Sequence, residues 1–178
     1  GGLCMPCAGG YRAQMETARE ERVKLASGAD PFWSYWLSLV DRVHECEDGF
    51  DRLSDPEKLY FGVNLLSREV FNGGFDAYFW NSSASYYPYA VSGLKALGAH
   101  ATLDLLGAAR SAMFGEDEMP LDVEERREYL IERQPEGTPP EISEQLEKLN
   151  EVFCKDREEI DSRLELFLLS FGFVKPNA

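Results

Sequence analysis

The chain has few of the residues on which most metal sites and enzyme sites depend. Its 178 residues include four cysteines and two histidines. Cys4 and Cys7 form a C-x-x-C pair, which supplies two ligands where a structural zinc site needs four. His44 and His100 are far apart, and the sequence contains no zinc-protease, serine-hydrolase or phosphate-loop motif. We therefore predict no metal site, no cofactor, no catalytic residue and no enzyme activity.

Long hydrophobic runs are also missing. No apolar segment approaches the length that spans a bilayer, which excludes a membrane protein as the expected class. The N-terminus lacks the basic segment and apolar core of a secretory signal, so we expect a cytoplasmic protein. Residues 1–10 are expected to be a disordered tail or a non-native remnant.

Basic residues are scarce relative to acidic ones. The chain has 18 Lys and Arg against 32 Asp and Glu, a formal net charge of −14. The excess is concentrated in residues 116–165, where 18 acids and 7 bases give −11. Such a surface repels nucleic acid and attracts basic partners, although an acidic face can also serve solubility alone.

Apolar residues recur at helical spacing almost throughout, and no segment alternates like a strand. We predict an all-α fold, a single compact multi-helix domain over 11–178 with a long acidic C-terminal helix. Asp30 before Pro31 and the pair Ser54 and Glu57 are helix-start signals. The predicted helices are 11–27, 31–47, 54–71, 82–97, 102–114, 122–134 and 143–170.

The last predicted helix carries acids at a repeating interval. Six of them share one face over 21 residues, which is about 31 Å, or roughly one charge per 6 Å. One DNA strand carries a phosphate about every 3.4 Å, so a second acidic row is needed to resemble duplex DNA. The acids of the last helix and of the second row at 122–132 are Glu144, Glu147, Glu151, Glu158, Asp161, Glu165, Glu125, Glu128 and Glu132.

An ordinary solvated helix face is the alternative explanation of these acids. Acid–base pairs four residues apart stabilise an exposed helix and neutralise part of its charge. Three such pairs are expected, namely Glu144 with Lys148, Glu151 with Lys155 and Glu159 with Arg163.

Residues 72–83 combine two glycines, four aromatics and several small polar side chains. We interpret the segment as a glycine turn that ends a helix, an aromatic plug, and serines that cap the next helix. The alternative is a small-ligand or catalytic pocket around Asp76 and Asn81, floored by the aromatic side chains. The residues in question are Asn72, Gly73, Gly74, Phe75, Asp76, Tyr78, Phe79, Trp80, Asn81, Ser82 and Ser83.

This segment resembles the DNA-mimic-protein family of small acidic bacterial proteins, many of them known only as a domain of unknown function. The resemblance rests on the runs N-G-G-F at 72–75, Y-F at 78–79, N-S-S at 81–83 and A-L-G-A at 96–99, and it covers about residues 30–172. Family members often have a polar residue at the position of Ala77 and a glycine at that of Ala84.

The resemblance implies a mostly helical homodimer whose acidic surface imitates DNA. The implied partner is a basic DNA-binding protein such as a transcription factor, with no direct binding of nucleic acid. A toxin-neutralising, immunity-type protein would use the same acidic surface against a different partner.

Overall fold

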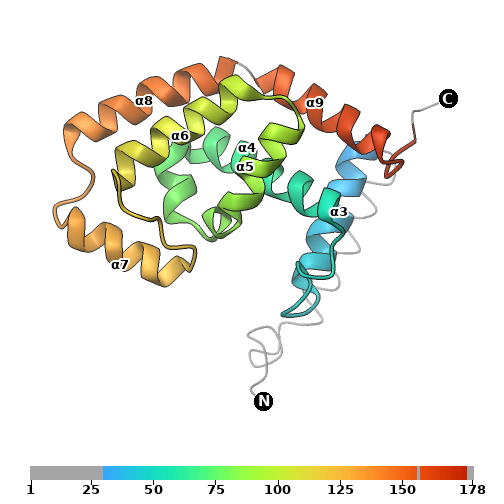
Figure 1. The fold of residues 1–178 in the computed structure, drawn as a ribbon, viewed down its shortest axis with the longest axis horizontal. Helices are drawn as coiled ribbons and strands as arrows, with labels where there is room; N and C mark the ends of the chain where they lie inside the picture. The colour runs from blue at the N-terminus through green and yellow to red at the C-terminus, as the bar shows by residue number, and fades with distance from the viewer. Residues whose placement is uncertain (1–29, 156, 176–178) are drawn as a thin grey trace. The chain divides into compact units, whose positions relative to one another are not determined.

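The computed structural model of the protein describes residues 30–155 and 157–175 (Figure 1). Within those ranges the chain forms helices and loops and no β-strand, so the predicted all-α class is confirmed. The predicted tail of residues 1–10 and the predicted helix of 11–27 lie outside the described residues. Contacts group the chain into two compact units, Gly1–Arg52 with Gly172–Ala178, and Leu53–Phe171. The expectation of one domain over 11–178 stays a prediction.

The described part of the first unit contains helix α3, Pro31–His44. The carboxylate of Asp30 accepts a hydrogen bond of 3.0 Å from the backbone N–H of Phe32, so Asp30 is the N-cap that the sequence predicts. In the same unit, the ring of Tyr35 stacks on that of Phe173 with 5.5 Å between centroids.

The second unit is built around helix α4, Asp55–Trp80. Glu57 accepts hydrogen bonds from the backbone N–H and the hydroxyl of Ser54, which confirms the predicted capping box. Helix α4 contacts every other helix of this unit, so it forms the centre of the core. The others are η1 (Ser82–Tyr86), α5 (Tyr87–Ala96), α6 (His100–Phe114), α7 (Val123–Arg133), α8 (Pro140–Lys155) and α9 (Arg157–Ser170).

Helices α4 and α5 approach closely because glycines lie at their contact. A Cβ atom added at Gly62 would lie 2.7 Å from the backbone nitrogen of Ala90, and one added at Gly93 would lie 2.6 Å from a methyl group of Val63. Any larger residue at either position would push the two helices apart.

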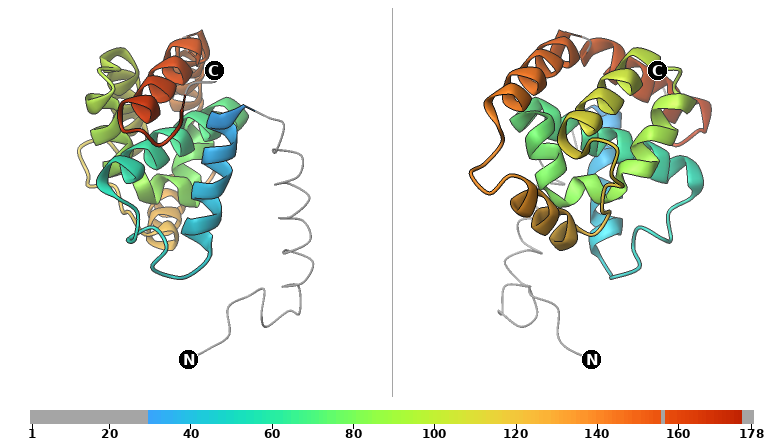
Figure 2. Two further views of the ribbon diagram at one scale, coloured as in Figure 1. Left: turned by 90° about the vertical axis from the view of Figure 1, so that its right-hand side faces the viewer. Right: turned by 60° about the vertical axis from the view of Figure 1, so that its left-hand side comes forward.

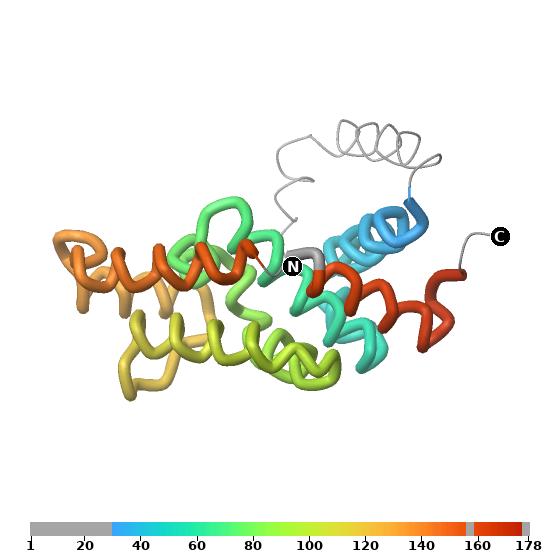
Figure 3. Tube along the Cα trace, turned by 90° about the horizontal axis from the view of Figure 1, so that it is seen from above, coloured from blue at the N-terminus to red at the C-terminus, as the bar shows by residue number. Residues whose placement is uncertain are grey.

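The acidic C-terminal stretch, predicted as one helix over 143–170, is helical on both sides of residue 156, as α8 and α9. Residue 156 lies outside the described residues. Figure 3 shows α8 running alongside α6, with α9 continuing beyond it, and the contacts place α8 on both α4 and α6. The side chains of both helices therefore divide between a buried face on the core and a solvent-exposed face.

Candidate functional site

The helix end predicted at 72–74 is confirmed at Gly74, where the backbone is non-helical; α4 kinks there, and a second helical segment follows to Trp80. The residue has φ 84° and ψ 178°, a conformation that only glycine adopts without strain. The kink frees the N–H of Phe75, and the side-chain oxygen of Asn150 on α8 accepts a hydrogen bond of 2.9 Å from it. That bond replaces the missing helical one, so the helix resumes and continues to Trp80.

The aromatic side chains after the kink belong to the core. Phe75 packs edge-to-face on Phe153 of α8, and Phe79 does the same with Phe114 of α6, with centroids 5.4 Å apart in each pair. Tyr78 is fully buried, its hydroxyl finds no hydrogen-bond partner among the residues that the structure describes, and burial raises its pKa well above the usual range. The side chains of Phe75, Tyr78 and Phe79 therefore fill the core, as the interpretation of this segment as an aromatic plug predicts.

The side chain of Glu69 on α4 holds the N-S-S segment of residues 81–83 in place. One carboxylate oxygen accepts a hydrogen bond of 2.9 Å from the side-chain amide of Asn81, and the other accepts one of 2.9 Å from the hydroxyl of Ser83. Helix α5 begins at Tyr87 without a side-chain cap, so the expectation that a serine caps it is wrong. Asn81 and Ser83 instead tie the 3₁₀ turn back onto α4.

Replacing Asn81 by alanine is expected to lower the free energy of unfolding by about 1–2 kcal/mol, because Glu69 then loses one of its two partners while partly buried. Chemical unfolding of the variant measures this loss. Ser82→Ala is the control, since Ser82 is exposed, and it is expected to change stability by less than about 0.5 kcal/mol. Equal stability of the two variants would contradict the tie.

Arg126 of α7 is fully buried, which the sequence did not predict for an arginine among six charged neighbours. Its guanidinium donates to the backbone oxygens of Phe79 and Asn81, at 2.7 Å each, and to those of Pro120 and Leu121, at 3.0 and 2.9 Å. Burial lowers the pKa of Arg126, yet an arginine keeps its charge in proteins. The cation satisfies carbonyls at the end of α4, the negative pole of the helix.

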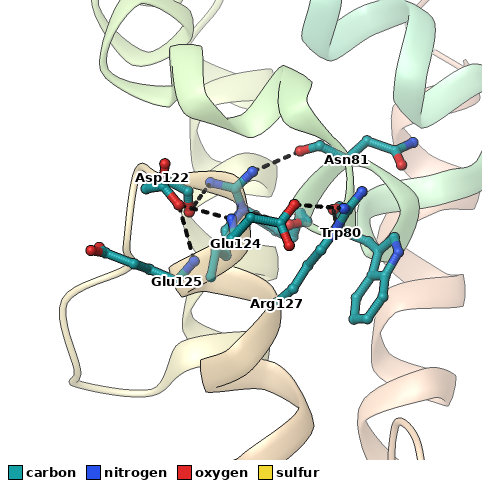
Figure 4. A network of polar contacts seen from close by, with 8 residues as sticks. Trp80, Asn81, Asp122, Glu124, Glu125 and Arg127 are labelled. Atoms are coloured by element: carbon teal, nitrogen blue, oxygen red, sulfur yellow. Dashed lines mark hydrogen bonds and ion pairs between the residues drawn. The ribbon is translucent and has the colours of Figure 1, made fainter.

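Figure 4 shows the start of α7 beside the end of α4, with a cap on α7 and a second arginine that reaches α4. Asp122 caps α7 by accepting from the N–H groups of Glu124 and Glu125. Arg127 donates to the backbone oxygen of Trp80 at 3.1 Å, pairs with Glu124, and lies 5.5 Å from the centroid of the Trp80 ring. The start of α7 is therefore anchored at both Trp80 and Asn81.

The predicted acidic residues are on the surface wherever their side chains are described. The exposed residues of this predicted set are Glu125, Glu128 and Glu132 on α7, Glu144, Glu147 and Glu151 on α8, and Asp161 and Glu165 on α9. The side chain of Glu158 lies outside those that the structure describes. Figure 2 shows α7 well apart from α8, so these acids form separate rows.

Part of this charge is neutralised within the protein. Two of the three predicted pairs are formed, Glu144 with Lys148 at 2.9 Å and Glu159 with Arg163 at 2.6 Å. The third predicted pair, Glu151 with Lys155, is not formed, and Glu151 makes no ion pair within residues 30–155 and 159–175. The same holds for Glu147 and for the three acids on α7.

A cavity of about 520 Å³ opens beside the last turn of α4. Asp76 and Asn81 line it, as the pocket hypothesis requires, together with Trp80. The other aromatics of the motif are buried in the core and do not line it. The rest of the wall comes from α6, α7 and the loop of residues 134–138, with Met113, Leu130 and Ile131 as its apolar part.

Two kinds of site are absent from the described part of the chain. No group of three or more His, Cys, Asp or Glu side chains there is placed to hold a metal ion. No helix in those ranges is long and apolar enough to cross a bilayer.

Sequence reasoning missed Glu69, Arg126 and Asn150. Arg126 lies three residues after Val123 and four before Leu130, the spacing of the inward face of α7, and this was the one available signal. Glu69 and Asn150 carry no comparable signal, because their partners are far along the chain.

A family model described as DMP19-like protein matches residues 51–171, which is more than half of the chain. The matched range contains the kink, the N-S-S segment, the buried arginine and the helices that carry the acidic rows. No curated protein and no solved structure matches the chain significantly. The extent of the family match shows that this chain belongs to the DMP19-like protein family.

Proposed function

We propose that the protein is a non-catalytic DNA mimic, which binds a basic DNA-binding protein through the exposed acids of α7, α8 and α9. One observation supports this most directly. Glu128 on α7 and Glu147 and Glu151 on α8 are exposed carboxylates that form no ion pair within the described residues. Membership of the DMP19-like family and the resemblance to DNA-mimic proteins are compatible with such a role.

The spacing of the acids supports imitation of phosphates. Glu144, Glu147 and Glu151 follow one another at intervals of three and four residues, so they share one face of α8. Glu125, Glu128 and Glu132 do the same on α7. Successive acids are then about 4.5–6 Å apart along each axis, a lower density than that of DNA. Two separate rows supply part of the deficit, and a homodimer would double both.

Electrostatic attraction of this kind makes a definite demand on the partner. The surface must meet a basic face, and the association must weaken steeply as salt screens the charges over about 10 Å at 0.1 M ionic strength. A DNA-binding face meets this requirement, since it is shaped to contact two rows of phosphates.

Reversing Glu128, Glu147 and Glu151 to lysine is expected to abolish capture of the partner while leaving the fold intact. All three side chains are exposed and unpaired, so their replacement should change stability by less than about 1 kcal/mol. The measurement is a pull-down from a lysate of the source cells at low salt, with and without competing duplex DNA. A captured DNA-binding protein that the duplex displaces is the expected result.

A matched control separates local charge from total charge. Reversing Glu45, Glu47 and Asp104, which are exposed and lie outside the acidic rows, also changes the net charge from −14 to −8. Capture should persist in that variant. Capture that survives reversal of the acidic rows would refute the mimic. A partner indifferent to DNA would instead indicate an immunity-type role.

A further inference from the structure

The cavity beside α4 owes its position to the helical spacing of four residues. Asp76 and Trp80 are four apart, as are Ala77 and Asn81, so all four side chains lie on neighbouring rows of the last turn. The small side chain of Ala77 leaves space beside the longer side chains of Asp76, Trp80 and Asn81. At about 520 Å³ the cavity is within the range of sites for small molecules and single side chains.

Asp76 is the charged group of this cavity. Its carboxylate is exposed and makes no hydrogen bond or ion pair within residues 30–155 and 159–175. The arginines of α7 on either side of Leu130 and Ile131 do not neutralise it. Arg127 pairs with Glu124, and Arg133 pairs with Asp117 at 2.7 Å. Asp76 is therefore the one charged side chain among the residues that line the cavity.

The other residues that line the cavity indicate which kind of cationic side chain fits it. Trp80 is 42% exposed, and its ring already lies 5.5 Å from the guanidinium carbon of Arg127, so it accepts a planar cation at its surface. Leu130 and Ile131 form an apolar side that suits a hydrocarbon stem. The amide nitrogen of Asn81 donates to Glu69, which holds this side chain in place at the wall of the cavity.

We propose that this cavity binds an arginine side chain of the protein partner. The guanidinium of the bound arginine donates two hydrogen bonds to the carboxylate of Asp76 and packs on the ring of Trp80, while its aliphatic stem covers Leu130. A purely aliphatic side chain would leave Asp76 unpaired, and an ammonium group lacks the planar fork. This inference rests on the proposed function, since a protein partner supplies the arginine, and it adds an anchoring pocket to a surface otherwise held by charge.

The test uses arginine blocked at both ends, N-acetyl-arginine-N-methylamide, titrated into the full chain. The readout is the indole N–H signal of Trp80 in a proton–nitrogen correlation spectrum, assigned with a Trp80→Phe variant. Binding in the millimolar range is expected. The citrulline analogue, which has the same shape without the charge, should bind at least about tenfold more weakly. Equal binding of the two analogues, or no binding of either, overturns the proposal.

Three variants locate the binding. Asp76→Asn should weaken it about tenfold, and Ala77→Leu should abolish it by filling the cavity. Asp104→Asn makes the same chemical change at an exposed position outside the cavity and should leave it unchanged. An Asp76→Asn protein that binds like the parent overturns the proposal even if Ala77→Leu fails to fold.

A free amine is the competing source of the same chemistry. Agmatine carries the guanidinium without a peptide backbone, and if it bound more than about tenfold tighter than blocked arginine, the assignment to a protein partner would be wrong. None of these probes involves the acidic rows, and reversal of Glu128, Glu147 and Glu151 leaves Asp76 intact. Failure of the pocket and failure of the DNA mimic are therefore separate results.

Discussion

Replacing Arg126 by methionine is expected to lower the free energy of unfolding by about 3–5 kcal/mol. Methionine retains most of the apolar stem but has no donor. The backbone oxygens of Phe79, Asn81, Pro120 and Leu121 then lose their shared partner. Each buried, unpaired carbonyl costs about 1–3 kcal/mol, and partial access of water keeps the sum below a simple total.

Urea unfolding of the parent and the variants measures this loss. Arg127→Met is the matched control, because Arg127 is the neighbouring arginine, is about one-third exposed, and makes a surface ion pair. It should lose no more than about 1 kcal/mol. Arg126→Lys should fall between the two, since one ammonium group cannot reach all the carbonyls that the planar fork joins. Similar losses at the two arginines would contradict the assigned role of Arg126.

The elements that the sequence predicted well are those with local signals. Asp30 and Ser54 start helices, and in each case the capping partner lies within three residues along the chain. A local pattern contains all the information that such a contact needs. The extent of α6 and α7 followed in the same way from apolar spacing between glycine- and proline-containing loops.

The glycines at 73–74 show where local reasoning stops. They correctly indicated a residue with positive φ, and Gly74 has it. They did not indicate which group accepts a hydrogen bond from the N–H of Phe75 at the kink, because Asn150 lies 75 residues further along the chain.

In the candidate site, too, features with a local sequence signal were predicted, and features that depend on distant contacts were not. Exposure of the acids on α7 and α8 followed from helical periodicity, as did the two ion pairs that form. The burial of Arg126 did not, because composition places arginine at the surface and only the fold places α7 beside the end of α4. The cavity was predicted around Asp76 and Asn81, but its apolar wall comes from α6 and α7, which no local pattern assigns to it.

The motif and the proposed function therefore occupy different parts of the molecule. Gly74, Phe75, Asn81 and Ser83 serve the fold through the kink, the plug and the tie to Glu69. The acidic rows lie on helices whose inner faces pack on that core. Surface acids can change without loss of the fold, so conclusions about a partner depend on the rows, and on Asp76 and Trp80 at the cavity, rather than on the buried residues of the motif.

Replacing Gly74 by alanine is expected to destabilise the protein by about 3–5 kcal/mol. Backbone strain contributes about 1–3 kcal/mol, because φ is +84° in a region that residues with a Cβ avoid. The new Cβ would also lie 2.6 Å from the side-chain nitrogen of Asn150. If Asn150 moves away, the N–H of Phe75 loses its acceptor at a further cost of about 1–3 kcal/mol.

Gly107→Ala is the matched control for this substitution. Gly107 lies inside α6 and a Cβ there would meet nothing within 4 Å, so alanine should stabilise the protein by about 0.5–1 kcal/mol through its higher helix propensity. Thermal unfolding of both variants gives opposite shifts if the kink is specific to Gly74. Asn150→Ala removes the acceptor without adding strain, so its loss should account for only part of the Gly74→Ala effect. A Gly74→Ala variant as stable as the parent would contradict this account. It would mean that α4 tolerates a residue with a Cβ at position 74 and does not depend on the hydrogen bond between Asn150 and Phe75.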